Sequence, residues 1–512
     1  MKKNEQPKEQ KLRQQSDGRP LAPTIVPRSP ITYRMQGAKP NPQRTPSPGE
    51  RQKALYLAPL SQACDTFSRT SCRSPTLTVA RIGPPQNDKS KQGMPMTDDR
   101  SDVLFGSWLH APTHQAWLNA EGLRLLAFAK AAKVPQGFAN LDARGQLPAD
   151  AVAETMNTAR MTHSFAMAHV QGIPGCLALV EHGVAALLGP LRDSAHGGWY
   201  ALAEHRDGNT GKAAYLHAFV ALAASSAVQA GVADADVLLQ QAVQVLDLYF
   251  WSEEEGALRE SFNRDWREEE AYRGANSNMH GVEAFLALAD ATGETRWLER
   301  ALQIVERVIH GHAADNDFAV IEHFDRQWQP LKDYNHDNPA DGFRPYGTTP
   351  GHAFEWARLL LHLEAALERA CYAAPDWLAH DAVSLFDSAC RHAWNVDGAR
   401  GLVYTLDWHN QPVVRQRLHW VHAEASATAA ALRKRTGAQR YELWYRRFWD
   451  FIEQHFIDRE HGSWHHELDT ANAPAGTIWA GKPDLYHAYQ AVLLPQLPLA
   501  PSLTAALVEL ST

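Results

Sequence analysis

Apolar residues recur at helical spacing from residue 115 to the end of the chain, as in "VLLQQAVQVLDLYF" at 237–250. The i, i+3, i+4 spacing predicts a succession of amphipathic helices. Several are rich in alanine, as in "AFVALAASSAVQAG" at 218–231, which favours close approach of neighbouring helices. The helices are expected at 115–133, 160–171, 174–189, 212–230, 234–251, 276–292, 294–311, 350–372, 376–393, 419–436, 438–457, 483–495 and 502–510.

A short motif with alternating residues after a glycine or turn recurs between alternate helices, and each copy predicts a brief β-ribbon. The copies begin 59, 62, 83 and 61 residues apart, a period typical of stacked helical hairpins that cannot bury their apolar faces alone. The motifs are "GGWYALAE" from 197, "GALRESFN" from 256, "FAVIEHFD" from 318, "GLVYTLDW" from 401 and "GSWHHELD" from 462.

Twelve main helices in six hairpins predict an all-α fold, an (α/α)6 barrel with short β-ribbons at the active-site end. In such a ring the inner helices all start at one end, and the ribbons lie just before those starts, so this end is expected to carry the site. An open α-solenoid is the alternative, but its repeats are usually shorter. Here the polar residues also concentrate at helix starts rather than along one face.

Histidine recurs at the starts of all six expected inner helices, each time beside a cation, phenol, amide or acid. A single histidine on a helix face is more often structural than catalytic, whereas six at equivalent places indicate a functional site. The starts read "ARMTHSF" (159–165), "KAAYLHAF" (212–219), "ANSNMHGVEAF" (275–285), "TTPGHAFEW" (348–356), "LHWVHAEA" (418–425) and "KPDLYHAYQ" (482–490).

The stretch "RPYGTTPGHAFEW" at 344–356 predicts a carefully built helix start. Thr349 is expected as the N-cap and Pro350 at the first helical position, where its missing N–H costs nothing. His352 then faces the positive end of the helix dipole, which favours a lowered pKa and a neutral imidazole. Glu355 shares its face and can fix the tautomer of His352 or hold a substrate hydroxyl. The alternative is a simple capping turn with a helix-stabilising glutamate. Pro483 is likewise expected at the first helical position before His487, with Lys482 favouring and Asp484 opposing a lowered pKa.

Charge divides the 512 residues into two parts. Residues 1–95 hold 17 Lys and Arg against 6 Asp and Glu, a net charge of +11, with 14 of the 30 prolines and no histidine; the remainder carries −19. Such a composition predicts a disordered, basic, Pro-rich tail at 1–95 and a folded domain at 96–512. Met94 and Met96 lie just before the first globular-looking sequence, which favours an over-extended gene start over a tail that binds nucleic acid or lipid.

Several classes of protein are disfavoured. The acidic domain argues against a nucleic-acid partner, and no apolar run approaches the 18 residues of a membrane span. The tail has no signal-peptide pattern, and five scattered cysteines without CxxC spacing are typical of a cytoplasmic protein. No phosphate-binding, dinucleotide-binding, serine-hydrolase or HExxH motif occurs, so neither a cofactor nor a metal is expected.

Glycoside hydrolysis would need a convergent carboxylate pair, whereas imidazoles suit moving a carbon-bound proton beside a carbonyl. Moving a proton on the carbon beside a carbonyl is the chemistry of isomerases and epimerases.

The quoted helix starts resemble those of the N-acylglucosamine 2-epimerase superfamily, and most closely its bacterial aldose–ketose isomerases. The matching segments are "KAAYLHAFVALAASSA", "RGANSNMHGVEAFLAL", "RPYGTTPGHAFEWARLL", "RLHWVHAEA" and "GKPDLYHAYQA", and the resemblance covers about residues 100–500 in order. It implies an (α/α)6 barrel and metal-independent interconversion of D-mannose and D-fructose, or close analogues, through a cis-enediol. Its partner would be a monosaccharide substrate, and both a monomer and a homo-oligomer are compatible with it.

The resemblance also implies roles for individual residues. His352 and His487 match the two acid/base histidines, either of which could take the C2 proton, and His280 matches a third histidine associated with ring opening. The expected substrate-binding residues are Arg160, Tyr215, Asn276, Glu355 and Glu424, completed by Trp420 and Arg344 within the quoted motifs.

Two other functions remain open from the sequence. The same site can serve a 2-epimerase acting on an N-acylglucosamine or a disaccharide, which must protonate C2 from both faces. A catalytically silent sugar-binding protein is disfavoured, because a binding module has no use for two neutral bases. Within the isomerase interpretation, mannose, lyxose, sulfoquinovose and N-acylated sugars are all candidate substrates, and a sulfonate would need a cationic or multi-donor pocket.

Overall fold

The structure is a computed structural model of the chain, and it describes residues 106–204 and 210–512. The chain divides into two units, 1–99 and 100–512, and only the second contains described residues. The predicted tail at 1–95 and its boundary therefore lie outside the described residues and stay a prediction.

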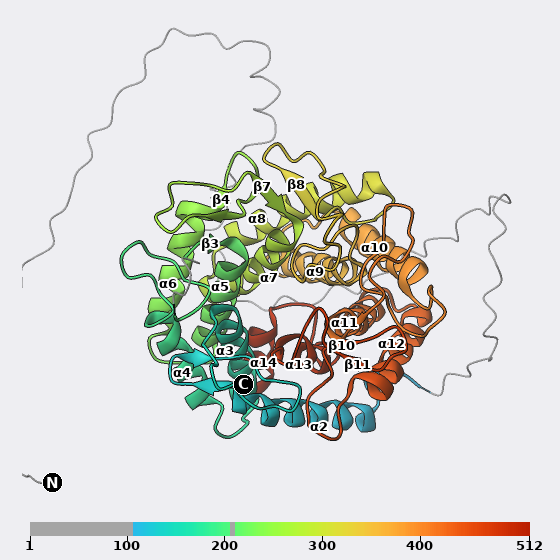
Figure 1. Cartoon of the computed structure of the whole chain (residues 1–512), viewed down its shortest axis with the longest axis horizontal. Coiled ribbons are helices and arrows are strands. Elements are labelled where there is room, and N and C mark those ends of the chain that lie inside the picture. The colour runs from blue at the N-terminus through green and yellow to red at the C-terminus, as the bar shows by residue number, and fades with distance from the viewer. Residues whose placement is uncertain (1–105, 205–209) are drawn as a thin grey trace, which may run out of the picture. The chain divides into compact units, whose positions relative to one another are not determined.

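Six inner helices form a ring in which each helix contacts the next and the last returns to the first (Figure 1). An outer helix packs against each inner one, so the predicted (α/α)6 barrel is confirmed. The inner helices are α3 (Thr155–Val170), α5 (Ala214–Gln229), α7 (Ala275–Thr292), α9 (Pro350–Arg369), α11 (His419–Thr436) and α13 (Tyr486–Leu493). The outer helices are α2 (Pro112–Ala129), α4 (Leu177–Leu188), α6 (Ala235–Val245), α8 (Arg296–Val305), α10 (Trp377–Ala393) and α12 (Gln439–Phe451).

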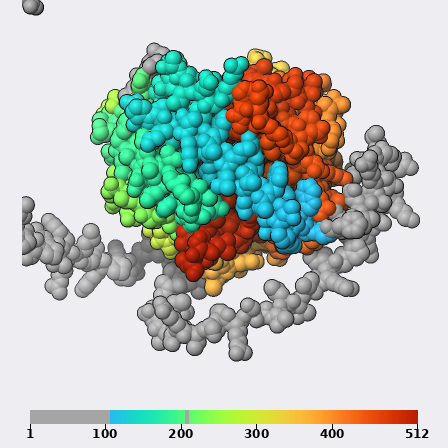
Figure 2. Space-filling view, turned by 90° about the horizontal axis from the view of Figure 1, so that it is seen from below, coloured from blue at the N-terminus to red at the C-terminus, as the bar shows by residue number. Residues whose placement is uncertain are grey.

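The two ends of the domain close the ring. Helix α2 packs against α13, so the first outer helix is the partner of the last inner one. In Figure 2, α2 (blue) lies across the seam between the green N-terminal and the orange-red C-terminal helices. The short helix α14 (Leu503–Ser511) contacts α3, α5 and α7.

The predicted ribbons from 256, 318 and 462 contain very short antiparallel strands, whereas those from 197 and 401 form only isolated antiparallel β-bridges in the described residues. Strands β3, β7 and β9 directly precede α5, α7 and α11, and each pairs with the ribbon motif that follows the same helix. The ribbons are thereby joined to the starts of the inner helices. The strands are β1 (Lys133–Val134), β2 (Gly137–Phe138), β3 (Lys212–Ala213), β4 (Trp251–Ser252), β5 (Ala257–Leu258), β6 (Ser261–Phe262), β7 (Tyr272–Gly274), β8 (His323–Asp325), β9 (Arg417–Leu418), β10 (Glu467–Leu468) and β11 (Pro474–Ala475).

Several helix boundaries differ from the prediction. Helix α3 begins at Thr155 rather than 160, so Arg160 lies in its second turn. Helix α13 begins at Tyr486, three residues after Pro483, so the expectation of Pro483 at the first helical position is wrong. Three outer helices pass into π-helical segments near their expected ends, at Leu246–Phe250, Glu306–Ala313 and Ile452–Phe456. Short 3-10 turns occur at Trp108–His110, Lys130–Ala132, Ala314–Asn316 and Leu494–Gln496.

Small residues set the spacing between inner and outer helices. A Cβ on Gly183 of α4 would overlap the hydroxyl of Thr162 on α3 and lie 3.1 Å from its Cβ. The Thr162 hydroxyl is itself fixed, because it donates to the Thr158 carbonyl at 2.7 Å. Close packing of this kind leaves no room for an added methyl group.

We therefore expect Gly183→Ala to destabilise the barrel by about 1–3 kcal/mol, although alanine is the better helix former. Chemical denaturation of the full chain measures the effect. Adding Thr162→Ala removes the overlapping hydroxyl and should recover part of the loss, which makes the two changes non-additive. A Gly183→Ala protein as stable as the parent would contradict this packing argument.

Candidate active site

A pocket with about 700 Å³ of empty space, part of it open to solvent, lies where the inner helices start. Eight of the ten residues expected from the sequence line it, and they come from helices far apart in the chain. These eight are Arg160, Tyr215, Asn276, His280, His352, Glu355, Trp420 and His487. The remaining lining residues are Met156, Asn157, Gly342, Phe343, Tyr404, His419, His466, Trp479, Pro483 and Asp484.

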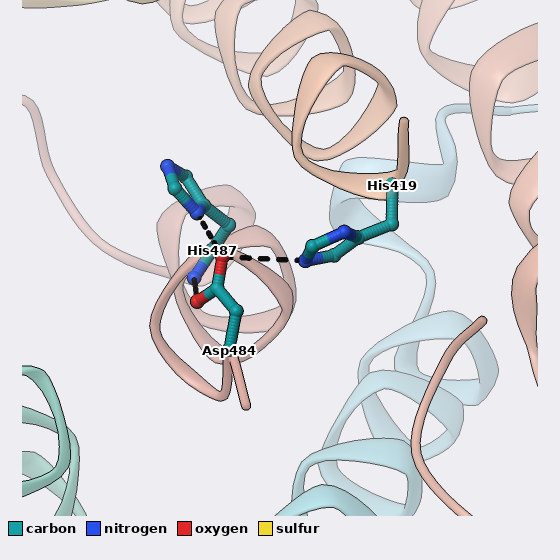
Figure 3. Close-up of side chains that lie close together, drawn as sticks. All are labelled: His419, Asp484 and His487. Atoms are coloured by element: carbon teal, nitrogen blue, oxygen red, sulfur yellow. Dashed lines mark hydrogen bonds and ion pairs between the residues drawn. The ribbon is translucent and has the colours of Figure 1, made fainter. Parts of the chain in front are cut away.

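His487 is oriented by Asp484, one turn earlier in the chain. The Nδ1–H of His487 donates to Oδ2 of Asp484, while the other ring nitrogen points away from the carboxylate (Figure 3). His419 Nε2 lies 3.3 Å from the same Oδ2, and the ring of His419 stacks on His466 with centroids 4.0 Å apart. Asp484 therefore fixes the tautomer of His487 and leaves its Nε2 for chemistry.

Burial lowers the pKa of His487, and the charge of Asp484 partly opposes that shift. The expected direction is confirmed, but the cause differs from the sequence argument. Lys482 does not act on His487, since its ammonium group binds Asp458. Although burial opposes it, the charge of His487 and a bond with His419 hold the pKa of Asp484 well below its ordinary value. Asp484 is accordingly a carboxylate.

His352 takes its orientation from a residue that the sequence did not single out. Its Nδ1 lies 3.0 Å from both oxygens of Glu322, in the ribbon "FAVIEHFD". Glu355 therefore does not fix the tautomer, which corrects one of its two expected roles. Thr349 and Pro350 occupy the predicted cap and first helical positions, but the Thr349 hydroxyl makes no capping bond.

Trp420 packs near both principal histidines. Its ring centroid lies 5.2 Å from that of His352 and 5.8 Å from that of His487, with both pairs tilted by 35°. A Cβ on Gly351 would approach the Trp420 ring to 2.4 Å, so only glycine admits the indole at this helix start. The indole thus contacts both imidazoles within the same cavity.

A second group of polar residues forms the floor. Arg358 binds Glu424 through Nε and Nη2 at 2.8 and 3.2 Å, and its Nη2 lies 3.6 Å from Glu355. His280 Nδ1 lies 3.4 Å from Glu283 and 3.8 Å from Glu355. Burial lowers the pKa of His280 to about 4, so this imidazole is neutral near pH 7.

Arg160 supplies the positive charge of the lining. Its Nη2 donates to the Tyr215 hydroxyl at 2.8 Å, and its Nη1 lies 3.9 Å from Asp484. The guanidinium also lies over the Phe219 ring, 4.3 Å from its centroid. Burial raises the pKa of Tyr215 to about 12, which keeps the phenol protonated.

Two expected substrate-binding residues do not line the cavity. Arg344 bonds to Glu270 at 2.8 Å and lies 3.4 Å from Glu260, and it borders a neighbouring pocket instead. Glu424 is 1% exposed and binds Arg358, and neither residue is among those that line the cavity. A carboxyl oxygen of Glu424 nevertheless lies within 4.8 Å of ligand atoms of Glu355 and His487, and the substrate-binding roles of Arg344 and Glu424 stay predictions.

Sequence reasoning missed several lining residues. Tyr404 comes from the ribbon "GLVYTLDW", while Phe343 and Trp479 come from loops and pack edge to face at 5.1 Å. His466 lies in the ribbon "GSWHHELD", where the double histidine was the available signal. Because ribbons and loops lack helical periodicity, aromatic residues there carry little sequence signal.

Three groups of side chains in the described residues have ligand atoms close enough to hold a metal ion. Within each group these atoms lie within 4.8 Å of one another. The groups are His419, Asp484 and His487; His280, Glu283 and Glu355; and Glu355, Glu424 and His487. The sequence-based expectation of a metal-free site thus requires an experimental test.

A family model described as N-acylglucosamine 2-epimerase (GlcNAc 2-epimerase) matches residues 137–491, and the chain belongs to this family. A D-mannose isomerase from Pseudomonas cannabina pv. alisalensis is 66% identical over 412 residues, which are 80% of this chain and 100% of the relative. A crystal structure of D-mannose isomerase superposes with a TM-score of 0.69 at 29% identity, covering 74% of this chain and 97% of the other.

A cellobiose 2-epimerase from Spirochaeta thermophila DSM 6192 shares the fold. It superposes with a TM-score of 0.64 at 21% identity, covering 75% of this chain and 96% of the other. In the described part of the chain, no helix is long and apolar enough to cross a membrane.

Asp484→Asn provides a direct test of the coupling between Asp484 and His487. Because the carboxylate raises the pKa of His487, its neutralisation should lower that pKa further. An NMR titration of the histidine ring signals measures the shift. His114, which lies 2.8 Å from the Tyr445 hydroxyl elsewhere in the fold and whose pKa burial lowers to about 4, should keep this pKa in the variant and serves as the control. A His487 pKa that stays constant or rises would contradict the assigned pairing.

Proposed function

We propose that this protein is an aldose–ketose isomerase that interconverts D-mannose and D-fructose. The observation that carries the proposal is the 66% identity to a D-mannose isomerase along the full length of that relative. The cavity supports it, because two imidazoles, each with Nδ1 on a carboxylate, flank Trp420 within one pocket. A neutral imidazole with a fixed tautomer is suited to general base catalysis.

In this mechanism, His487 Nε2 takes the proton from C2 of the open-chain aldose. The electron pair moves to form a C1–C2 double bond, and the carbonyl oxygen O1 gains negative charge and then a proton, giving a cis-enediol. Return of the carbon-bound proton to C1 and loss of the O2 proton yield the ketose. We assign the transfers at O1 and O2 to His352, which like His487 contacts Trp420, and the opening of the sugar ring to His280.

The charges of the cavity favour a neutral sugar. Among the described residues that line it, Arg160 is the one guanidinium, and Tyr215 and Asp484 already engage it. Arg344, which the sequence analysis placed among the substrate-binding residues, is paired with Glu270 and Glu260 and is not among the cavity's lining residues. A sulfonate or phosphate at C6 would therefore meet no uncompensated cation among these lining residues.

Replacing either principal histidine tests the acid/base assignment. We expect His487→Ala and His352→Ala each to lower kcat/KM for D-mannose by about 10²–10⁴, the usual contribution of a positioned acid or base. NMR of the sugar mixture follows the reaction and should show fructose forming without glucose. His310→Ala, in an outer-helix ion pair, should keep wild-type turnover. Near-normal activity in both cavity variants would remove the assignment, and glucose as the first product would indicate an epimerase.

The pH profile and chelation test the expectation of a metal-free reaction. Because burial lowers the pKa of His487, protonation should reduce kcat/KM only below the ordinary histidine value of about 6.5, with a plateau near pH 7. EDTA treatment should leave both the plateau and the acidic limb in place. Loss of activity on chelation and its return with a divalent cation would instead assign a metal to one of the three side-chain groups described above.

A further inference from the structure

Glu355 is a buried carboxyl with one oxygen that accepts no hydrogen bond from the described residues. It is 1% exposed and lines the cavity, yet its Oε1 has no hydrogen-bond partner among the described residues. The nearest cationic and imidazole nitrogens, on Arg358 and His280, lie at 3.6 and 3.8 Å. Both distances exceed those of an N–H···O hydrogen bond.

The donors near Glu355 are committed to its neighbours. Arg358 uses Nε and Nη2 for Glu424 at 2.8 and 3.2 Å. Glu283 accepts from the Tyr486 hydroxyl and from Gln490 Nε2 at 3.2 Å, and it is the nearer carboxylate to His280. The Arg358 guanidinium thus lies near three carboxyl groups. Two of them, Glu424 and Glu283, accept hydrogen bonds, whereas Glu355 Oε1 accepts none.

An ionised carboxylate in this position would be costly. A buried charge without donors loses its hydration with no replacement, and the group takes up a proton instead. Burial raises the pKa of Glu355 well above its ordinary value, the charge of Glu424 adds to the effect, and Arg358 partly offsets it. The titratable and charged groups around it, from every inner helix, are Arg160, Tyr215, His280, Glu283, His352, Arg358, Glu424, Tyr486 and His487.

We infer that Glu355 is held as a carboxylic acid and donates a hydrogen bond from its O–H to O1 of the substrate. One ring nitrogen of His487 and one carboxyl oxygen of Glu355 lie within 4.8 Å of each other. Because both side chains line the same cavity, a sugar whose C2 is at His487 has O1 within reach of the Glu355 carboxyl. As that proton leaves, negative charge develops on O1, and an O–H···O⁻ bond strengthens in the transition state without the proton itself being transferred. The substrate half of this inference rests on the proposed isomerase function.

Two measurements test the protonation without activity. Glu355→Gln should remove the infrared C=O band of a protonated carboxyl at pH 7, a band that shifts in D₂O.

In the parent, the unfolded state ionises Glu355 above about pH 4.3 while the folded state keeps the proton, so the free energy of unfolding falls as pH rises. The Tm of Glu355→Gln should therefore rise relative to the parent between about pH 5 and 8. Glu364→Gln, on the same helix but paired with Arg435, should show no such rise. A parent spectrum without this band, or a flat or falling Tm difference, would overturn the inference.

Kinetics test the donor role. Glutamine is neutral and keeps a donor, so Glu355→Gln should lower kcat by less than about tenfold, whereas Glu355→Ala should lower it by about 10²–10³ with little change in KM. Equal losses of kcat in the two variants would overturn the donor role, and the infrared band would still show whether Glu355 is protonated.

A Tm increase with added Zn²⁺ or Mn²⁺ that Glu355→Gln abolishes would also overturn the inference, since it would require an ionised Glu355. A wild-type protein inactive on mannose would remove the proposed function and this substrate role together, but would leave the infrared and Tm tests of protonation intact.

Discussion

The site depends on acidic residues that the ribbons deliver to the starts of inner helices. Glu260 accepts from the Gly274 amide at 3.1 Å and the Ser277 hydroxyl at 2.9 Å as α7 begins. Glu322 holds His352 at the start of α9, and Glu467 accepts the amides of residues 477–479 ahead of α13. Helix starts expose unsatisfied N–H groups, and a buried start needs such partners. The repeated motif therefore organises the polar end of the barrel as well as its architecture.

This arrangement explains how an interior of apolar packing can carry a polar cavity. The inner helices are buried over most of their length, as in α5, where alanines allow close contact on all sides. Only their starts exchange apolar side chains for imidazoles, carboxyls and phenols. Burial then sets the chemistry of these groups, because it disfavours charge on His280, His487 and Glu355 while Asp484 stays ionised beside two histidines.

The sequence predicted the secondary structure that depends on local periodicity. It did not predict the side-chain pairings between segments that are distant in the chain. Helix hairpins, ribbons and the histidines at the helix starts follow from spacing and turn residues. The pairing of His352 with Glu322 joins residues 30 positions apart, and nothing local marks the glutamate as its partner. The position of Arg344 outside the cavity lining was not predictable, because Glu270 and Glu260 reach it only in the folded chain. Similarly, Glu424 lies a turn below His419 on α11, where Arg358 can engage it.

The contact between α2 and α13 has a consequence for biosynthesis. The first outer helix finds its partner only in residues 486–493, near the C-terminal end of the chain. Contacts so distant in sequence form late, because the entropy of loop closure must be overcome first. His487 and Asp484 arrive with the same segment, so a nascent chain still on the ribosome can have most of its hairpins and yet no complete cavity. A polypeptide released before this last hairpin would expose the apolar faces of α2 and α3 that α13 covers, and it would be a substrate for chaperones and proteases rather than a partial enzyme.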